Sequence, residues 1–372
     1  MTSIFEPYLP AFNGQVDLKK AYGWSLMQIQ VFMIEVIDEP STYGVDMRVV
    51  SELKQIRTDI IDLTEKGSRY QSEAPPPQAI LRKVNPAPSY YDDISSLMLD
   101  AKTYGGLPYW SLFDLLGRFL SLTGPAPQGA TQDNFYLPLT LMYTNWSQKM
   151  APRAPWVYSC VWAEEEDKQS RFHMGASLGG YRIPDGEPNG WCRALQRARF
   201  DVLHDERIQT AGIRFEDTPL TGRTGNPIPF GNCAETYPLV NILRNRAPSE
   251  EVFGLAVMLD ALPRTGEYDH EQAMSTMIRP CANCQRVITT WGGEVENFII
   301  RNYPEGYFLG GEWSPAPSSE RASDMSIDLS TGAKRPAPAD DIAEPEAKRA
   351  KGWRPEVPKK PSHLAMGKGR QQ

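Results

Sequence analysis

The chain has little of what marks a membrane, secreted or disulfide-stabilised protein. Its longest apolar stretches, such as Phe253–Leu259, are far too short to cross a bilayer. The N-terminus has no basic patch before an apolar segment, so no secretory signal is predicted. The 5 cysteines are few and odd in number, which favours reduced thiols or metal ligands over disulfides. Cys160 and Cys192 are expected to be buried apolar fillers. We therefore expect a protein of the nucleus or the cytoplasm, neither secreted nor bound to a membrane.

The chain also lacks a net positive charge. It carries 39 Lys and Arg against 46 Asp and Glu, a formal net charge of −7. Residues 315–372 contain 11 basic and 8 acidic side chains, which leaves 28 basic and 38 acidic ones in residues 1–314. An acidic body is a poor electrostatic match for phosphate backbones, so nucleic acid is the less favoured partner.

Hydrophobic periodicity and turn residues divide the folded part of the chain in two. Residues 1–150 are predicted to form a mainly helical N-terminal domain, because long apolar residues recur at helical spacing. The expected helical segments are Asp17–Asp38, Val45–Lys66, Tyr91–Leu122 and Asn134–Met150, with a break at Gly105–Pro108. In residues 151–314 short apolar runs alternate with Gly- and Pro-rich turns, which is typical of a mixed α/β domain. These runs are Trp156–Trp162, Phe172–Gly180, Gly212–Phe215, Phe253–Asp260 and Glu294–Arg301.

The last region, residues 315–372, is predicted to be a disordered basic tail, because it holds 8 prolines and no apolar periodicity. Two basic clusters lie in it, Lys334-Arg335 and Lys348-Arg349-Ala350-Lys351, separated by 12 residues. This spacing resembles a bipartite nuclear import signal, so an import receptor is an expected partner. A tail that only adds charge and solubility is the alternative.

Three of the five cysteines lie in two short motifs, Cys233-Ala234-Glu235 and Pro280-Cys281-Ala282-Asn283-Cys284. Asn232 before an apolar-periodic run predicts a helix start with Asn232 as N-cap and Cys233 in the first turn. Pro280 is predicted at the first position of a second helix, and Cys281 and Cys284 are spaced to share one face of one turn. Two such helix starts facing each other would supply three thiolates and leave a fourth metal position open, as in catalytic zinc sites.

Other interpretations fit parts of these motifs. Asn232 and Glu235 also have the spacing of a capping box, in which Glu235 only stabilises a helix start. The Cys-x-x-Cys pair alone is compatible with redox chemistry. A structural Cys₃His zinc site would need a fourth ligand, and His204 and His270 are the nearest histidines in sequence.

The segment from Gly231 to Gly310 resembles the cytidine deaminase superfamily, whose zinc enzymes carry an H/C-x-E and a P-C-x-x-C motif. The matching elements, in the order of that family, are a helix opened by Cys-Ala-Glu, an apolar strand ending in Asp260, a short run Thr276–Arg279, a helix from Pro-Cys-x-x-Cys to Trp291, and a strand near Phe298–Arg301. Periodicity alone leaves the run Glu251–Asp260 open as a short helix. Upstream, Ser170–Leu178 resembles the family's first strand but lies further ahead of Cys233 than expected.

The resemblance implies a cytidine deaminase-like mixed sheet sandwiched by helices, with Zn²⁺ held by Cys233, Cys281 and Cys284. It implies that Glu235 carries protons and that the backbone of Ala234 orients a base. The implied activity is zinc-dependent hydrolytic deamination of a nucleoside, a base or a related small molecule. Cys as first ligand resembles the enzymes of free nucleosides, whereas the polynucleotide editors mostly have His there.

Departures from the family pattern keep two alternatives open, an RNA- or DNA-editing deaminase and a non-catalytic deaminase-like binding scaffold. Thr236 stands where the free-nucleoside enzymes usually have an Arg that offsets the thiolate charge; Arg279 and Arg286 are candidate substitutes. Asn226 and Asn232 are the candidates for contacts to ribose. The helical region ahead of the domain is similar in placement to that of deaminase-like proteins of fungi and of bacterial toxin systems, and with the import signal it favours a fungal member.

Overall fold

The computed structural model describes residues 7–69, 79–81, 99–151, 154–165, 170–179, 190–204, 215, 220–221, 227–228, 230–243, 246–259 and 267–298. All of them belong to one compact unit, Met1–Gly311. The tail at residues 315–372 and its two basic clusters lie outside the described residues. Among the helices that are described, none is both long enough and apolar enough to cross a membrane.

The first helices begin at side-chain caps that the sequence supplies. Asp17 caps α1, and Ser25 forms a capping box with Gln28 at the start of α2. The predicted segment Asp17–Asp38 is therefore two helices, because Gly23 ends the first and Ser25 begins the second. The described helices up to residue 150 are α1 (Leu18–Tyr22), α2 (Leu26–Asp38), the 3₁₀ turn η1 (Met47–Val49), α3 (Val50–Arg69), α4 (Leu112–Leu122), the π-helical turn η4 (Gln132–Tyr136) and α5 (Leu137–Met150).

A β-hairpin stands where the sequence predicts a helical segment with a break. Its strands are β1 (Lys102–Tyr104) and β2 (Leu107–Tyr109), which pair antiparallel. Gly105 and Gly106 join them, and both have positive φ, 55° and 81°. Two consecutive residues with positive φ form the tight turn that suits the twist of a hairpin, which is why glycine occupies both positions.

The main sheet has the strand order β4-β3-β7-β8. Its strands are β3 (Val157–Glu164), β4 (Arg171–Ala176), β7 (Glu251–Met258) and β8 (Met277–Ile278). Val161 of β3 lies opposite His173 of β4 and Gly254 of β7, and each pairing in the described part of the sheet is antiparallel. The predicted mixed sheet is thus an antiparallel one here, because a short connection joins β3 to β4 and α8 (His270–Ser275) reverses the chain between β7 and β8.

The other predicted strands have different outcomes. The run Glu251–Asp260, which periodicity left open, contains strand β7. Ser170–Leu178 contains β4, which is the second strand of the sheet in chain order because β3 precedes it. At Glu294–Arg301 the chain forms a 3₁₀ turn, η6 (Val295–Phe298), and residues from 299 on lie outside the described part. Phe298 packs where a side chain on Gly254 would stand, so it acts as a core anchor. The short pair β5 (Leu220–Thr221) and β6 (Pro227–Ile228) completes the described strands.

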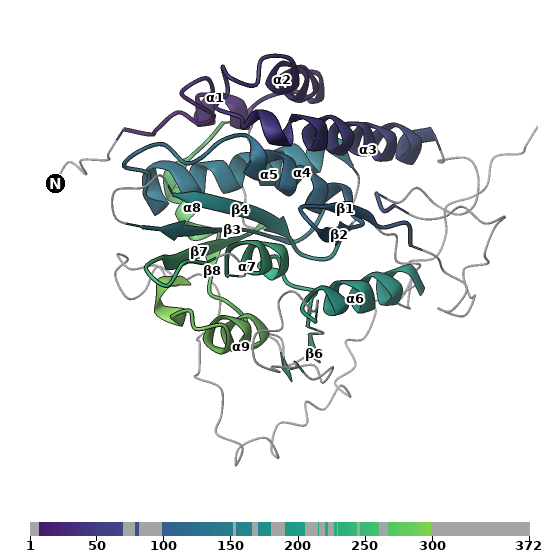
Figure 1. The fold of residues 1–372 in the computed structure, drawn as a ribbon, viewed down its shortest axis with the longest axis vertical. Coiled ribbons are helices and arrows are strands. Elements are labelled where there is room, and N and C mark those ends of the chain that lie inside the picture. Colours follow the sequence, from purple (N-terminus) through teal and green to yellow (C-terminus); the bar gives the residue numbers. More distant parts are fainter. Residues whose placement is uncertain are drawn as a thin grey trace, which may run out of the picture. The chain divides into compact units, whose positions relative to one another are not determined.

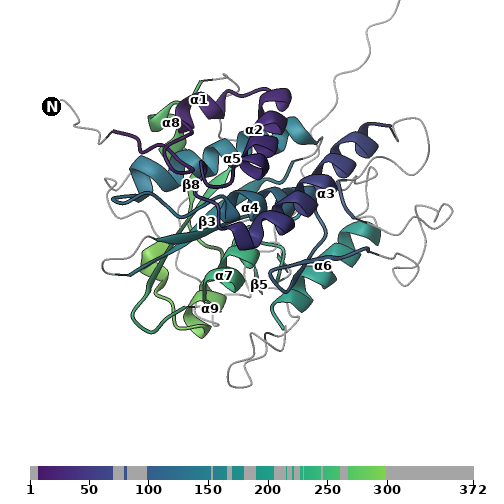
Figure 2. The ribbon, with the colours of Figure 1, turned by 45° about the horizontal axis from the view of Figure 1, so that its top comes forward.

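Helices cover both faces of this sheet, and the covering layers come from distant parts of the sequence (Figure 1). On one face α4 and α5 pack against it: the ring of Tyr136, just before α5, stacks on Trp162 of β3 with centroids 4.0 Å apart. On the other face lie α7 (Thr236–Leu243) and α9 (Ala282–Thr290). Figure 2 shows α1, α2 and α3 lying over α4 and α5, as a further outer layer.

The packing continues across residue 150. One hydrophobic cluster contains Phe113 and Leu116 of α4 together with Tyr158 of β3 and Val257 of β7. The division into two domains, residues 1–150 and 151–314, stays a prediction from the sequence. In the structure, helices from the first segment form one of the two layers that enclose the sheet of the second.

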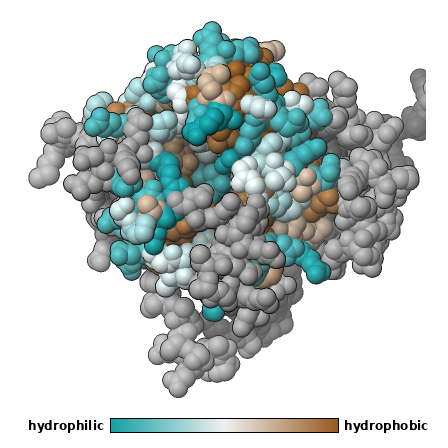
Figure 3. Space-filling model, in the orientation of Figure 1, coloured by the Kyte–Doolittle hydropathy of each residue, from teal (hydrophilic) through white to brown (hydrophobic). Residues whose placement is uncertain are grey.

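The outer face of α2 exposes apolar side chains. Met27, Val31 and Ile34 follow one another at helical spacing, and Met27 is 69% exposed. Brown residues appear in the upper part of Figure 3, where Figure 1 places α1 and α2. A hollow of about 270 Å³ lies beside them, lined by Ile34, Ile37, Asp38, Lys54, Arg57 and Thr58. This surface belongs to the outer helical layer, on the other side of the sheet from α7 and α9.

Candidate metal centre

The first cysteine lies on a short loop, residues 231–235, directly before α7 and after β6, and this loop approaches α6 (Gly190–Val202). Gly231 opens the loop with φ 80°, and a side chain there would come within 2.5 Å of the backbone of Arg199, so glycine permits the close approach to α6. The first helical hydrogen bond of α7 runs from the N–H of Leu239 to the carbonyl of Glu235, 2.8 Å. Cys233 therefore precedes the helix instead of lying in its first turn.

The sequence predicts Asn232 as the N-cap of α7, but in the structure this residue does not cap the helix. Its carbonyl accepts the N–H of Leu178 at 3.1 Å, which ties the loop to the residues after β4. The Oδ1 atom of Asn232 makes no hydrogen bond within the described part of the chain, so the predicted capping box with Glu235 does not form. The helix starts three residues later because Cys233 and Thr236 close a turn first, with 3.3 Å between the N–H of Thr236 and the carbonyl of Cys233.

The other two cysteines lie at the start of α9, as predicted. Cys281 is the N-cap, with extended backbone. Pro280, predicted at the first helical position, stands two residues before the first helical residue, Ala282. Cys284 is in the first turn and buried. Three residues of spacing therefore place both sulfurs on the same side of one helix turn.

The three cysteines meet. The Sγ atom of Cys281 lies 3.2 Å from that of Cys233 and 3.6 Å from that of Cys284, and all three sulfurs are within 4.8 Å of one another. Thiolates around a tetrahedral zinc ion at about 2.3 Å are separated by about 3.8 Å, so the two sulfurs nearest to that of Cys281 lie slightly closer than a bound ion would hold them. This donor set and geometry fit a thiophilic metal ion with one further coordination position. Cys160 is buried in β3 and takes no part in the cluster.

The three thiols have different acidities. The pKa of Cys281 is well below its usual value, because the neighbouring thiols and the N–H groups of Asn283 and Cys284 stabilise its thiolate. The pKa of Cys233 is well above the usual value, first because of its contact with Cys281 and also because of burial, whereas its contact with Cys284 acts in the opposite direction. The pKa of Cys284 is also well above the usual value, first because of its contacts with both other thiols and then because of burial. In the metal-free cluster Cys281 is thus the thiol that ionises first.

Glu235 lies against the same cluster. It is buried, only 5% exposed, and its pKa is raised to about 7, first by burial and then by the charge of Cys281. A contact with the thiol of Cys284 acts in the opposite direction. The carboxyl group therefore faces the sulfurs, and its protonation is balanced near neutral pH.

The remaining predicted residues are distributed as follows. Ala234 is buried between Cys233 and Glu235, whereas Asn226 lies outside the described residues. Arg286 is exposed on α9 and Arg279 is half-buried. Neither nearby histidine joins the cluster within the described part: the ring of His204 contacts the carbonyls of Phe200 and Phe215, and that of His270 contacts Tyr268. A structural Cys₃His site thus lacks its histidine among these residues.

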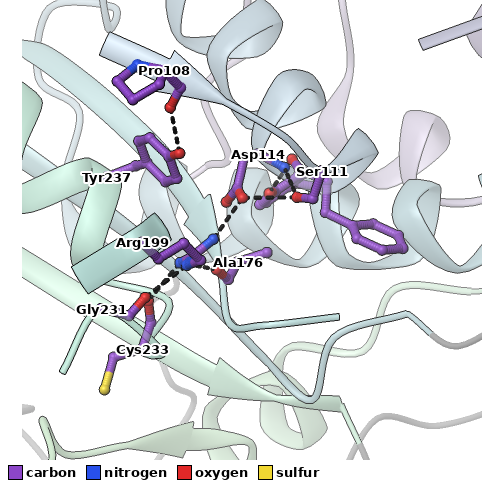
Figure 4. A network of polar contacts seen from close by, with 10 residues as sticks. Pro108, Ser111, Asp114, Ala176, Arg199, Gly231, Cys233 and Tyr237 are labelled. Carbon is purple, nitrogen blue, oxygen red and sulfur yellow. Dashed lines mark hydrogen bonds and ion pairs between the residues drawn. The ribbon is translucent and has the colours of Figure 1, made fainter. Parts of the chain in front are cut away.

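Sequence reasoning missed a buried arginine beneath the loop. Arg199 of α6 donates hydrogen bonds to the carbonyls of Gly231 and Cys233 and pairs with Asp114 of α4 (Figure 4). In the sequence, Arg199 is one of three arginines in the stretch Trp191–Phe200. Its burial depends on tertiary packing, so no local pattern distinguishes it from Arg193 and Arg197.

Comparisons with protein-family models, curated proteins and solved structures find no match to this chain. The resemblance to zinc deaminases therefore depends on the two motifs and on the cluster that their residues form.

Proposed function

We propose that the chain is a zinc-dependent hydrolytic deaminase that replaces an exocyclic amine of a nucleoside, a base or a related small molecule by a carbonyl group. The observation that carries the proposal is the meeting of Cys233, Cys281 and Cys284 with the buried carboxyl of Glu235. Three sulfurs leave one metal position open, which is typical of catalytic sites, and the carboxyl group stands beside them.

A bound zinc ion would lower the pKa of water in the open position toward neutrality and so supply a nucleophile. Glu235 would accept the proton of that water and pass it to a ring nitrogen and then to the leaving amine. Overall, water is consumed, a C–NH₂ group becomes C=O, and ammonia leaves. Burial, the largest cause of the raised pKa of Glu235, favours a carboxyl group that both accepts and donates a proton.

The choice of a small substrate follows from charge. The chain carries a net charge of −7, which disfavours the counterion release that drives binding to a polynucleotide backbone. A cysteine in place of histidine as first ligand supports the same choice, through the resemblance stated above. An editing enzyme of RNA or DNA is therefore tested as a separate outcome of the same experiment.

Metal analysis of the full chain, beside a substrate panel, tests the proposal. We expect about one zinc ion per wild-type chain and none in Cys281→Ser, since a tetrahedral catalytic site needs its three protein ligands. Cys160→Ala is the matched control, because this buried cysteine lies outside the cluster, and it should keep the metal. A wild-type chain that binds no zinc after refolding with the metal would refute the proposal.

The catalytic role of the carboxyl is tested separately by Glu235→Gln. This change keeps the shape of the side chain but removes the proton carrier, so ammonia release should fall by at least about 100-fold while zinc stays bound. The panel contains nucleosides, free bases and single-stranded oligonucleotides. Turnover confined to oligonucleotides would identify an editing enzyme, and zinc without Glu235-dependent turnover on any of them would identify a binding scaffold.

A further inference from the structure

Arg199 is one of the most deeply buried charged side chains of the described chain, with 1% exposure. Its guanidinium donates to the carbonyl of Gly231 at 2.6 Å, of Cys233 at 3.0 Å and of Ala176 at 2.9 Å. A fourth contact, 2.5 Å, is the ion pair with Asp114. Nearly the whole hydrogen-bonding capacity of the side chain is thus used, in the fixed fork that only arginine provides.

These contacts join elements that the chain itself keeps apart. Asp114 comes from α4, Ala176 ends β4, and Gly231 and Cys233 belong to the loop before α7 (Figure 4). The ring of Tyr237, in the first turn of α7, lies under the guanidinium with 5.1 Å between Cζ and the ring centroid. Arg199 therefore fixes the loop against both layers around the sheet.

Asp114 holds the arginine in this place. It is buried at the start of α4, and it also accepts a hydrogen bond from the hydroxyl of Ser111 at 2.7 Å. Removing the two charges from water costs free energy that offsets most of the attraction between them, so the ion pair contributes little to the stability of the fold. The contacts to two carbonyls of one loop point to a role in orientation.

The loop needs such orientation because Cys233 has no helix to hold it. Cys281 and Cys284 are fixed together by the first turn of α9, whereas Cys233 lies ahead of α7. Within the described residues its carbonyl accepts one further hydrogen bond, from the N–H of Thr236 at 3.3 Å. Because Arg199 holds the carbonyls of both Gly231 and Cys233, it restricts the backbone dihedral angles between them, and with them the position of the Cys233 sulfur relative to the other two.

We propose that Arg199, held by Asp114, is the positioning residue that sets Cys233 for metal binding. This inference rests on the proposed metal site and assigns no contact between Arg199 and the metal or the substrate. Groups that orient ligands without touching the metal typically change metal affinity by about 10- to 100-fold when they are replaced.

The decisive variant replaces the pair by apolar side chains, Arg199→Met with Asp114→Leu. Such a replacement of a buried ion pair is often neutral for folding, so it removes the orientation of the loop and leaves the core filled. Zinc affinity is measured by competition with a chromophoric chelator, and folding by urea unfolding of the metal-free chain. We expect zinc binding to weaken about 10- to 100-fold with an unchanged urea midpoint.

A second readout distinguishes positioning from support of the fold. In the Co²⁺-loaded protein the visible bands report the arrangement of the thiolates, and we expect them to shift in the double variant and in Arg199→Lys. Lysine keeps the charge but lacks the fork, so Arg199→Lys provides the same test if the double variant does not fold. The matched control is Arg118→Met with Glu52→Leu, a partly buried pair that also involves α4, which should leave affinity and bands unchanged.

The outcomes separate this inference from the proposed function. A wild-type chain without metal binding refutes the metal site itself. Metal binding by the wild type with the same affinity and Co²⁺ spectrum in the folded variants refutes the positioning role alone. Arg118 also donates to Asn241 of α7 at 3.5 Å. Equal losses in the Arg118 control would therefore also refute the positioning role, because the effect would then belong to the packing of α4 and α7 in general.

Discussion

At the scale of single residues, Cys281 does two things at once. It is the N-cap of α9, where N–H groups of the first turn stabilise its thiolate, and its sulfur touches those of both other cysteines. One helix start therefore provides two sulfurs as a rigid pair. Cys233 completes the set from a separate loop, so the geometry of the site depends on how that loop is held.

His173 gives the protein a dependence on pH that is unrelated to the cysteines. It is 3% exposed on β4, and its pKa is well below the usual value, because of burial and then of the positive charge of Arg118. Below about pH 6.5 the imidazole of His173 is protonated in the unfolded chain but stays neutral in the folded chain. The free energy of unfolding should therefore decrease as the pH falls below about 6.5, by up to about 1.4 kcal/mol per pH unit.

Urea unfolding of the wild type and of His173→Leu between pH 5 and pH 8 measures this contribution. The difference between the two slopes isolates His173, because other titrating groups such as His270 are present in both chains. The wild type should lose stability faster than the variant on acidification. Parallel curves would show that His173 is protonated in the folded protein or titrates alike in both states.

At the scale of elements, the approach of the Cys233 loop to β4 depends on a glycine. A side chain on Gly175 would stand 2.5 Å from the carbonyl of Ala234 and 2.5 Å from Cδ of Pro238, in α7. Gly175→Ala should therefore push the start of α7 away from the sheet. We expect a loss of about 1–3 kcal/mol in the free energy of unfolding and weaker metal binding, because Ala234 lies between Cys233 and Glu235.

Urea unfolding and zinc competition measure the two effects. Glu251→Ala, at an exposed position of β7 in the same sheet, is the control and should change stability by less than about 0.5 kcal/mol. An alanine at 175 that leaves both stability and zinc affinity intact would mean that α7 can move without disturbing the site.

The elements could be predicted where the local sequence decides them. Cys281 and Cys284 share a helix turn because of their spacing, and β7 is a buried strand because its apolar run is short. The sequence predicts the start of α7 three residues too early, since Asn232 has the chemistry of an N-cap but its carbonyl accepts the N–H of Leu178. That contact joins residues far apart in sequence, so no local rule reveals it.

At the scale of the whole molecule, the sheet is enclosed by helices from both ends of the described chain. Tyr158 and Trp162 of β3 point toward α5 and the turn before it, where Tyr143 and Tyr136 meet them. Without these helices one face of the sheet would be exposed to water. The loss of the N-terminal helices should therefore unfold the α/β part as well.

Urea unfolding of the full chain tests this expectation. Far-ultraviolet circular dichroism reports the helices. Tryptophan emission reports the 9 tryptophans of the chain together, among them Trp162 of β3, which is buried against Tyr136. We expect one shared midpoint for both signals. A fragment of residues 151–311 should fail to give a cooperative transition. Two separate midpoints, or a fragment that folds, would show that the helical segment is an independent domain.

Composition and periodicity indicated helices before residue 150 and a sheet after it, but not that they share a core. Amphipathic helices bury an apolar face, and the sequence does not say which surface receives it. The tertiary partners of Arg199 are likewise not predictable from the sequence. An arginine in a helix is usually exposed, and here only the meeting of α4, α6 and the Cys233 loop explains its burial.

The order of the layers along the chain has a consequence for synthesis on the ribosome. The helices α4 and α5 leave the ribosome before any strand that they cover. Until those strands are made, the apolar faces of the two helices stay exposed and can bind chaperones or aggregate. The cysteine pair of α9 emerges 48 residues after Cys233. The three sulfurs that could hold a metal ion therefore come together only when nearly all of the described chain has been made.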